Sequence, residues 1–240
     1  MNAYDITSQY YDAMANDQLV AVREKIAAAM QGVDCSQGPI IDIGAGTGLT
    51  TQVIARALPT AEILAIEPHA GMRAALMTRV CADPDLQRRV TILPMGIFEA
   101  PLPATISGAV ASAVLVHFDA LERARLWQLL RSRLTPGGRV VTDIQCPEAV
   151  DLPETRMASS RVGHIEYEGY AQAIAIPPSW QRWRMTYRAL LGGAEIERRV
   201  AEFVCHAASA GEIAKEATEA GFEVQARPDL VTMIRGVFDE

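Results

Sequence analysis

The sequence has little lysine, no paired cysteines and no long apolar run. Lys25 and Lys215 are its only lysines, so arginine supplies nearly all of the positive charge, and the net charge is −7. An acidic chain lacks the basic patches that attract phosphate backbones, which argues against a nucleic-acid partner. No apolar run approaches the roughly 18 residues of a membrane span, so no membrane partner is expected.

The four cysteines are widely scattered, with no C-x-x-C pair and no His/Cys cluster, so no structural zinc or other metal site is expected. Free buried thiols in a reducing compartment are the simplest interpretation of Cys35, Cys81, Cys146 and Cys205. The first residues, MNAYDITSQYYDAM, are acidic and polar where a secretory signal needs a basic end and an apolar core. We therefore expect a cytoplasmic protein.

Strand and helix patterns alternate over the first part of the 240-residue chain, which is long enough for one large domain or one domain with an insertion. Asp119 with Glu122, and Ser209 with Glu212, have the capping-box pattern of a helix start. The expected strands are 40–43, 63–66, 90–93, 109–116 and 139–144, and the expected helices are 19–30, 49–58, 71–81 and 119–134. This alternation predicts an α/β fold, a doubly wound, mostly parallel sheet with helices on both faces.

The rhythm changes after residue 144. Segments 164–176 and 182–205 are expected to be extended, with turns at Pro177-Pro178 and Gly192-Gly193, which predicts an antiparallel β meander. A helix over 212–220 and strands after Gly221-Phe222 and over 231–237 follow. We divide the chain into an N-terminal helical lid segment (1–36), an α/β core (37–150), an inserted substrate cap or dimerisation surface (151–208) and a C-terminal part that completes the core sheet (209–240).

The run IIDIGAGTGLTT at 40–51 places three glycines directly behind an apolar strand. A Walker-type phosphate loop needs a lysine here, and none lies near. The dinucleotide fingerprint is G-x-G-x-x-G, whereas Gly44, Gly46 and Gly48 are spaced by two, which disfavours a nicotinamide dehydrogenase. Asp42 precedes the loop, where a carboxylate would repel a pyrophosphate and favour an ammonium group.

The pattern D-x-G-x-G-x-G after the first strand resembles the first motif of class I S-adenosylmethionine (SAM)-dependent methyltransferases of the small-molecule type. The resemblance implies a Rossmann-like methyltransferase fold with SAM as cofactor, and glycines let the backbone approach such a ligand. Glu67 ends the second strand in ILAIEPHAGM, and the resemblance implies that its two oxygens accept both ribose hydroxyls. Met72 lies where the family often packs an apolar side chain near the adenine.

Later segments match the same family in order: VLVHF at 114–118, then LWQLLRSRLTPGGRVV and SAGEIAKEATEAGFEV, so that the matches run from Ile40 to Val224. One departure concerns the adenine. The family commonly has an acid after the third strand, whereas PMGIFEAPLP has none at that place, where Gly96 or Ile97 stands. Backbone groups and the side chains of Ile97 or Phe98 are therefore expected to hold the ring, although Phe98 suits the core equally well.

His117 follows the fourth strand, at the sheet edge where ligands bind in doubly wound folds. A neutral imidazole there could take a proton as the methyl group arrives, and a hydrogen-bonded structural histidine is the alternative. Tyr10 and Tyr11 lie in SQYYDAM, which resembles the N-terminal lid segment of many small-molecule methyltransferases. They would close over the cofactor or serve as ordinary packing aromatics.

The meander supplies acceptor candidates. A strand over 182–189 places Trp183 and Tyr187 on one face and three arginines on the other. The aromatic face could line an acceptor pocket, while pairing with Glu195 and Glu197 explains the arginines without a ligand. Tyr167 and Tyr170 fall in the same region, where an acceptor site, a sheet edge or a homodimer contact would each use them.

The sequence thus predicts an enzyme that transfers a methyl group from SAM to nitrogen or oxygen of a small-molecule acceptor by in-line displacement. The alternatives are a protein methyltransferase and a non-catalytic SAM-binding regulatory protein. The expected catalytic residue is His117, and the acceptor set is Tyr10, His117, Tyr167, Tyr170, Trp183 and Tyr187. The expected cofactor set is Tyr11, Asp42, Gly44, Ala45, Gly46, Gly48, Glu67, Pro68, Met72, Gly96, Ile97, Phe98 and Val114.

Overall fold

The computed structural model describes residues 2–15 and 17–237, so the ranges 1–36 and 209–240 include a few positions outside the described residues. The chain forms two compact units. One combines residues 1–20 with 148–207, and the other combines 21–147 with 208–240. The segment 1–36 is therefore shared between the units rather than forming a piece of its own.

The second unit is built on a seven-stranded sheet in the order β10-β11-β5-β4-β1-β2-β3. Strands β1 to β5 run parallel to one another, β11 is antiparallel to β5, and β10 is antiparallel to β11. The strands are β1 (Ile40–Ile43), β2 (Ile63–Ile66), β3 (Val90–Leu93), β4 (Ile106–Ala111), β5 (Leu134–Asp143), β10 (Glu223–Arg227) and β11 (Leu230–Ile234). This confirms the predicted doubly wound, mostly parallel sheet.

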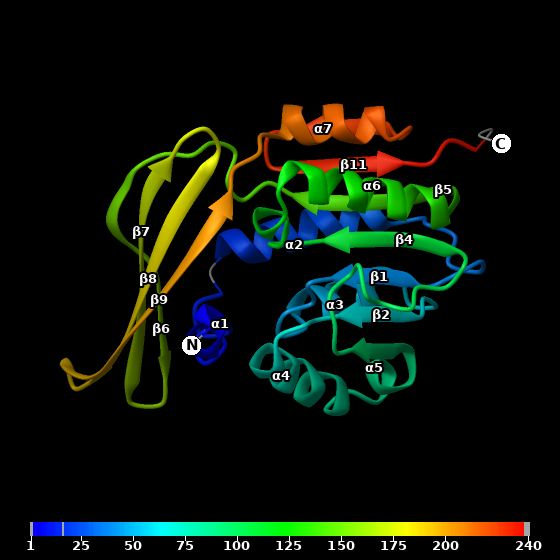
Figure 1. Ribbon diagram of the computed structural model, residues 1–240. Coiled ribbons are helices and arrows are strands. Elements are labelled where there is room, and N and C mark those ends of the chain that lie inside the picture. The colour runs from blue at the N-terminus through cyan, green and yellow to red at the C-terminus, as the bar shows by residue number, and fades with distance from the viewer. Residues whose placement is uncertain (1, 16, 238–240) are drawn as a thin grey trace. The chain divides into compact units, whose positions relative to one another are not determined.

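Helices cover both faces of this sheet (Figure 1). Leu126 and Ile213 belong to one apolar cluster, and Ile26 and Leu76 belong to the other. The capping boxes of α6 and α7 form as their sequences predict. The helices are α2 (Asp17–Met30), α3 (Leu49–Ala57), α4 (Ala70–Cys81), α5 (Pro84–Arg89), α6 (Ala120–Arg133) and α7 (Ala210–Glu219).

The strand expected over 109–116 is wrong in its second half. β4 ends at Ala111, and residues Leu115–His117 form a short 3-10 helix, η1. The physical reason is Ala113, whose φ of 58° is incompatible with an extended strand. Leu115 and Val116 are buried in η1, just as the residues of β4 are buried in the strand. An apolar run in the sequence therefore does not distinguish the two conformations.

The first unit is an antiparallel sheet in the order β6-β7-β8-β9, which confirms the meander. A short helix, α1 (Ala3–Thr7), belongs to this unit, and Tyr4 of α1 stacks on Phe203 with ring centroids 6.4 Å apart. The strands are β6 (Leu152–Val162), β7 (Ile165–Ile176), β8 (Trp180–Leu191) and β9 (Ala194–His206). The sequence analysis missed β6 because it is polar, contains a proline and lies mostly exposed at the sheet edge.

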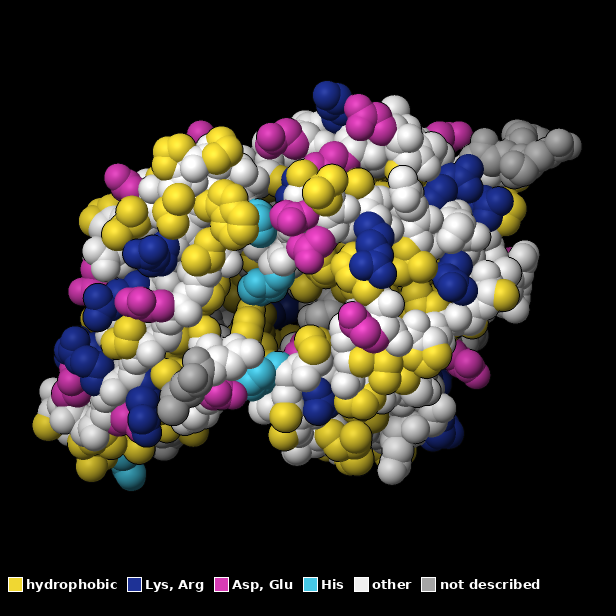
Figure 2. All heavy atoms as spheres, viewed as in Figure 1, with side chains coloured by type: hydrophobic (Ala, Val, Ile, Leu, Met, Phe, Trp, Pro, Cys, Tyr) yellow, Lys and Arg dark blue, Asp and Glu magenta, His cyan; other side chains and the backbone are white. Residues whose placement is uncertain are grey.

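Two of the three arginines of β8, Arg184 and Arg188, pair with acids on neighbouring strands, which supports the interpretation without a ligand for these two. The predicted partner Glu197 pairs with Arg199 instead. Arg188 lies 2.6 Å from Glu195, and Arg184 lies 3.6 Å from Glu202. Over the face shown in Figure 2, acidic and basic side chains are interspersed. Pairing of this kind stabilises an exposed sheet face only modestly.

All four cysteines are free thiols. Cys146 and Cys205 are buried as expected, whereas Cys81 is exposed and Cys35 is half-buried. The expectation of four buried thiols is therefore wrong for Cys81, which lies in the last turn of α4 where that helix meets solvent. Among the described residues, no helix is both long and apolar enough to cross a bilayer.

Candidate functional site

The candidate site lies at the carboxyl edge of the parallel strands, beside β1. The chain passes from β1 to β2 and β3 on one side and then returns to β4 on the other side of β1. This reversal is the topological switch point at which ligands bind in doubly wound sheets. The glycine loop, Glu67 and the 114–118 segment all follow strands at this edge.

The three glycines of the loop have different surroundings, although each has a positive φ. A β-carbon on Gly44 would lie 2.6 Å from a methyl of Val114, and one on Gly48 would lie 2.6 Å from a methyl of Leu76. A β-carbon on Gly46 would have no atom nearer than 3.7 Å, the terminal methyl of Met72. Packing excludes a side chain at Gly44 and Gly48, whereas a β-carbon on the buried Gly46 would make only ordinary contact with Met72, and its φ of 58° is what favours glycine there.

Glu67 ties this loop to the end of β2. Its side chain is only 6% exposed. Its Oε2 accepts the N–H of Gly46 at 2.9 Å, and its Oε1 accepts the N–H of His69 at 2.7 Å. Each carboxylate oxygen has two lone pairs and keeps one for a ribose hydroxyl. Pro68, which follows, is exposed, and His69 caps α4 by accepting the N–H of Met72.

Asp42 is buried under the loop and is 1% exposed. It accepts a hydrogen bond of 2.5 Å from Thr51 Oγ1 of α3. Burial raises the pKa of Asp42 to about 7, against the Thr51 hydrogen bond, and the nearby Glu67 carboxylate adds to the rise. Asp42 does not cap α3, because the N-cap is Gly48 and the bond to Asp42 comes from a side chain.

The loop after β3 holds its predicted residues in two different environments. Ile97 is 4% exposed and belongs to the core cluster with Leu126. Phe98 meets Phe118 edge-on at 5.9 Å, and the guanidinium of Arg125 lies 4.2 Å from the centre of its ring. Phe98 therefore packs against the core cluster, as the alternative interpretation held.

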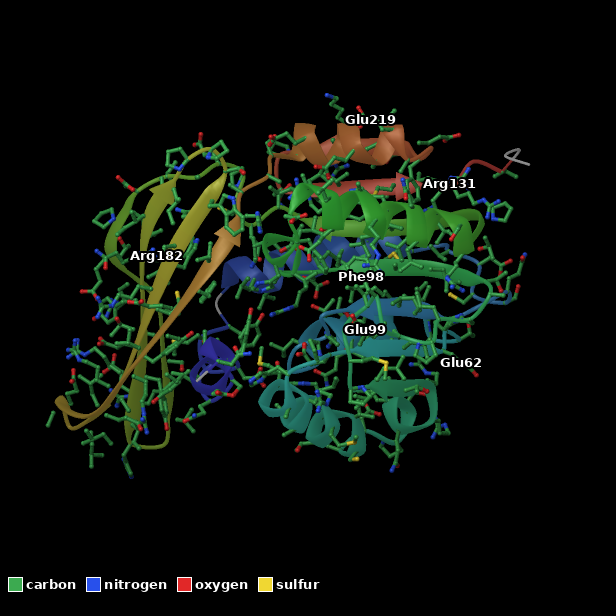
Figure 3. All side chains as sticks on the ribbon, viewed as in Figure 1. Glu62, Phe98, Glu99, Arg131, Arg182 and Glu219 are labelled. Atoms are coloured by element: carbon green, nitrogen blue, oxygen red, sulfur yellow. The ribbon has the colours of Figure 1, made fainter. Side chains whose placement is uncertain are left out.

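The sequence analysis overlooked an acid in this loop. Glu99 Oε2 lies 2.5 Å from the position that a β-carbon on Gly96 would take. Glu99, labelled with Phe98 in Figure 3, thus folds back over the glycine at the place where the family's acid is absent. Glu99 follows Gly96 by three residues, and its N–H donates to the carbonyl of Gly96 at 3.3 Å. A turn of this kind brings the side chain of its last residue back to its first residue, which is the sequence signal for this contact.

The 114–118 segment contacts the glycine loop through Val114, whose methyl fills the space beside Gly44. The N–H of His117 donates to the carbonyl of Val114 at 3.0 Å, which closes η1 and sets the half-buried His117 at the end of the turn. The structure therefore brings Val114, the glycine loop and Met72 together, and His117 lies at the same edge of the sheet.

Arg23 is a residue that the sequence analysis missed. Met30 of α2 packs on Gly108 near the start of β4, and Arg139, which pairs with Gly108 from β5, donates to the carbonyls of Ala29 and Gln31. The carboxyl end of α2 thus lies at the amino edge of the sheet. Arg23, two turns earlier in α2, therefore lies roughly 10 Å towards the carboxyl edge.

Arg23 is 8% exposed, and within the part of the chain that the structure describes its guanidinium makes no hydrogen bond or ion pair. It lies close enough to Asp143 to lower the pKa of that carboxyl, although burial has the larger effect and raises this pKa to about 6. No nitrogen of this guanidinium is fully buried, so the charged end of the side chain meets solvent. Such a group suits an anion, and a helix position alone gave the sequence analysis no signal for it.

The aromatic candidates of the first unit belong to its core. Tyr10 is 3% exposed, stacks on Tyr187 with ring centroids 4.8 Å apart, and donates to Glu197 Oε2 at 2.5 Å. Burial is the largest cause that raises the pKa of Tyr10 to about 12. Tyr187 donates to Thr7 at 3.3 Å. Tyr10 therefore packs as an ordinary aromatic of this unit, Tyr187 packs against it, and any contact of either side chain with an acceptor stays a prediction.

The sheet separates the remaining candidates. Tyr167 and Trp183 share the face of Tyr187 by register, because Tyr167 pairs with Ala189 and Trp183 pairs with Ala173. Tyr170 lies on the opposite face, where it donates to Glu168 at 3.0 Å. Tyr170 and Trp183 therefore cannot line one pocket within this unit. Tyr11 is half-buried in the same unit, and its contact with a cofactor stays a prediction.

Comparison with known sequences identifies one part of the chain. Residues 41–140 match the family described as a methyltransferase domain. The uncharacterised protein syc1184_c of Synechococcus sp. is 33% identical over 100 residues, which are 41% of this chain and 23% of that protein. The chain thus spans about a quarter of the length of this curated relative.

Three solved structures share the fold of the whole chain. DesVI of Streptomyces venezuelae has a TM-score of 0.77 at 15% identity and covers 98% of this chain and 99% of its own. The sugar N-methyltransferase KedS8 of Streptoalloteichus sp. has a TM-score of 0.73 at 16% identity, with 96% and 93% covered. SAM-bound CalS10 of Micromonospora echinaspora, an amino pentose methyltransferase, has a TM-score of 0.71 at 15% identity, with 98% and 97% covered.

The two raised pKa values predict a stability that falls as the pH rises. An unfolded aspartate has a pKa of about 3.9, whereas Asp42 and Asp143 have pKa values of about 7 and about 6 in the folded chain. The folded state therefore keeps protons that the unfolded chain loses above about pH 4, and this contribution disappears as the pH passes through 6 and 7. The free energy of unfolding, measured with urea, should drop by roughly 4 kcal/mol between about pH 5 and pH 7.5. Asp42→Asn should flatten the slope, and an unchanged slope in that variant would contradict the assignment.

Proposed function

We propose that this chain, whose residues 41–140 match a methyltransferase domain, is a class I SAM-dependent methyltransferase that transfers a methyl group to the amino nitrogen of a sugar-like small molecule. The observation that carries the proposal is the carboxyl edge of the parallel strands, where the glycine loop and the buried acids Asp42 and Glu67 lie together and where Arg23 lies close to Asp143. The acceptor class is supported by KedS8 and CalS10, whose names specify a sugar nitrogen and an amino pentose.

The residues at this edge fit the cofactor group by group. The backbone of Gly46 beside Met72 is proposed to face its methionine portion, and Asp42 beneath the loop favours its ammonium group. Glu67 keeps one lone pair on each oxygen for the two ribose hydroxyls. Arg23, a cation with no protein acceptor, suits its carboxylate. The remaining cofactor residues proposed from the sequence are Tyr11, Gly44, Ala45, Gly48, Pro68, Met72, Gly96, Ile97, Phe98 and Val114.

SAM, when bound, supplies a methyl group on a positively charged sulfur that a nucleophile displaces in line. The chain aligns the acceptor and excludes water, and such alignment can lower the barrier by roughly 7–11 kcal/mol. An amine reacts only through its lone pair, so it has to lose its proton. His117, at the end of η1 beside the glycine loop, is proposed to hold that proton.

The first unit is proposed to supply the acceptor contacts and a dimerisation surface, with Tyr167, Trp183 and Tyr187 on the face that α1 shares. Tyr10 and Tyr170 remain in the proposed acceptor set. A protein acceptor and a non-catalytic role are less favoured, because the named acceptors of KedS8 and CalS10 are sugars.

The proposal predicts methylation of amino sugars and not of the matching hydroxyl sugars. The purified chain, incubated with labelled SAM, should add label to amino hexoses and amino pentoses at the amino nitrogen, as located by mass spectrometry and NMR. The matched control is the same sugar with a hydroxyl in place of the amine. Labelling of the hydroxyl sugar alone would replace nitrogen by oxygen as the methylated atom. Labelling only of proteins in an extract would overturn the small-molecule proposal.

Arg23→Gln should weaken binding of S-adenosylhomocysteine by about 10- to 100-fold, the loss expected for a charge-assisted hydrogen bond. Binding of 5′-methylthioadenosine, which lacks the amino-acid end, should stay unchanged in the same calorimetric titration. Arg88→Gln is a matched control, because Arg88 is an exposed arginine that pairs only with Asp85. Equal losses for both ligands would instead assign Arg23 a structural role.

His117→Ala should lower kcat by roughly 100-fold or more, because the amine loses its proton acceptor. The affinity for S-adenosylhomocysteine should stay within about twofold, since η1 is closed by a backbone hydrogen bond. Raising the pH should restore part of the activity, as more of the free amine is then unprotonated. A variant with normal kcat would remove His117 from the mechanism.

A further inference from the structure

Ala113 lies where the chain leaves β4, and its backbone is strained. Its φ is 58°, and it is the only non-glycine residue with a positive φ in the part of the chain that the structure describes. A left-handed conformation brings the β-carbon close to the next carbonyl, so alanine adopts it only where another interaction compensates.

Asp143 supplies that interaction from the end of β5. Its Oδ1 accepts the N–H of Ala113 at 2.7 Å. Asp143 is 5% exposed, and the residue before it pairs with Ala111 across the β4–β5 ladder. A short hydrogen bond to a buried carboxylate is stronger than one between neutral groups, and it is held in place by the ladder itself.

The bond determines the course of the next five residues. Directly after Ala113, Val114 places a methyl 2.6 Å from the position of a β-carbon on Gly44. The carbonyl of Val114 then accepts the N–H of His117 at 3.0 Å. Asp143, the glycine loop and His117 are thus joined through one short piece of backbone.

We propose that Asp143 is a positioning residue: by holding Ala113 in the left-handed conformation, it seats Val114 on the glycine loop and sets His117 at the carboxyl edge. Its effect on turnover rests on the proposed function, whereas its effect on the loop and on cofactor binding does not. Asp143 also faces Arg23 of α2, so its removal has an electrostatic effect as well. The two effects are separable at Ala113, because glycine adopts a positive φ without strain and leaves Arg23 untouched.

The experiment is a set of variants tested for binding of S-adenosylhomocysteine. Asp143→Ala should weaken binding about tenfold, and Asp143→Asn, which keeps an acceptor oxygen for Ala113, should lose about threefold or less. Adding Ala113→Gly to Asp143→Ala should restore binding to within about threefold of the parent chain. Ser112→Gly is the matched control, because it adds the same flexibility one residue earlier, where φ is not positive, and it should restore nothing.

Hydrogen exchange at the amides of Ala113 and His117 gives a second measurement that needs no acceptor. Both amides should exchange at least about tenfold faster in Asp143→Ala, and His117 should recover in the Ala113→Gly double variant. Failure of Ala113→Gly to rescue, or equal rescue by Ser112→Gly, would overturn the proposal. If no acceptor is ever methylated, the proposed function fails while these binding and exchange results still decide the role of Asp143. If the chain methylates an acceptor, kcat should rank the variants in the same order as their affinity for S-adenosylhomocysteine.

Discussion

The carboxylate of Glu67 is the interaction on which the candidate site depends. It is buried at the end of β2, and burial of a charge is favourable only where hydrogen bonds replace water. Its two oxygens meet this need by accepting the N–H groups of Gly46 and His69. The glycine loop of β1 and the start of α4 are therefore fixed to the same side chain. Any ligand that uses the remaining lone pairs of Glu67 meets a loop that is already in place.

Sequence reasoning succeeded where the signal is local. Three glycines behind an apolar strand, an acid at the end of the next strand, and two capping boxes are patterns within a few residues, and each formed as expected. It failed where the outcome depends on distant contacts. The end of β4 is set by a bond from Ala113 to Asp143, 30 positions later, and Arg23 matters only because α2 runs antiparallel to the strands.

The antiparallel unit shows the same division. Alternation along β8 correctly separated the face of Trp183 and Tyr187 from the arginine face, because a strand has a period of two. Alternation could not give the register, which places Tyr170 on the opposite face from Tyr187. β6 escaped notice because neither of its faces is buried, so no apolar pattern is required of it. The two faces of one strand can be derived from its sequence. Whether residues of two strands share a pocket depends on the register in which those strands pair.

The charges at the carboxyl edge distinguish the ligand, as the glycine spacing does. Asp42, Glu67 and Asp143 are buried there, and the cations of the same edge include Arg23 and Arg73, whose guanidinium donates to the backbone carbonyl of Glu67. A pyrophosphate would bring two negative charges next to the Glu67 carboxylate, and their repulsion would oppose its binding. SAM carries two positive groups, the sulfonium and the ammonium, and one carboxylate. That pattern suits an edge with buried acids and Arg23, so the charges and the glycine spacing favour the same ligand, a sulfonium nucleoside.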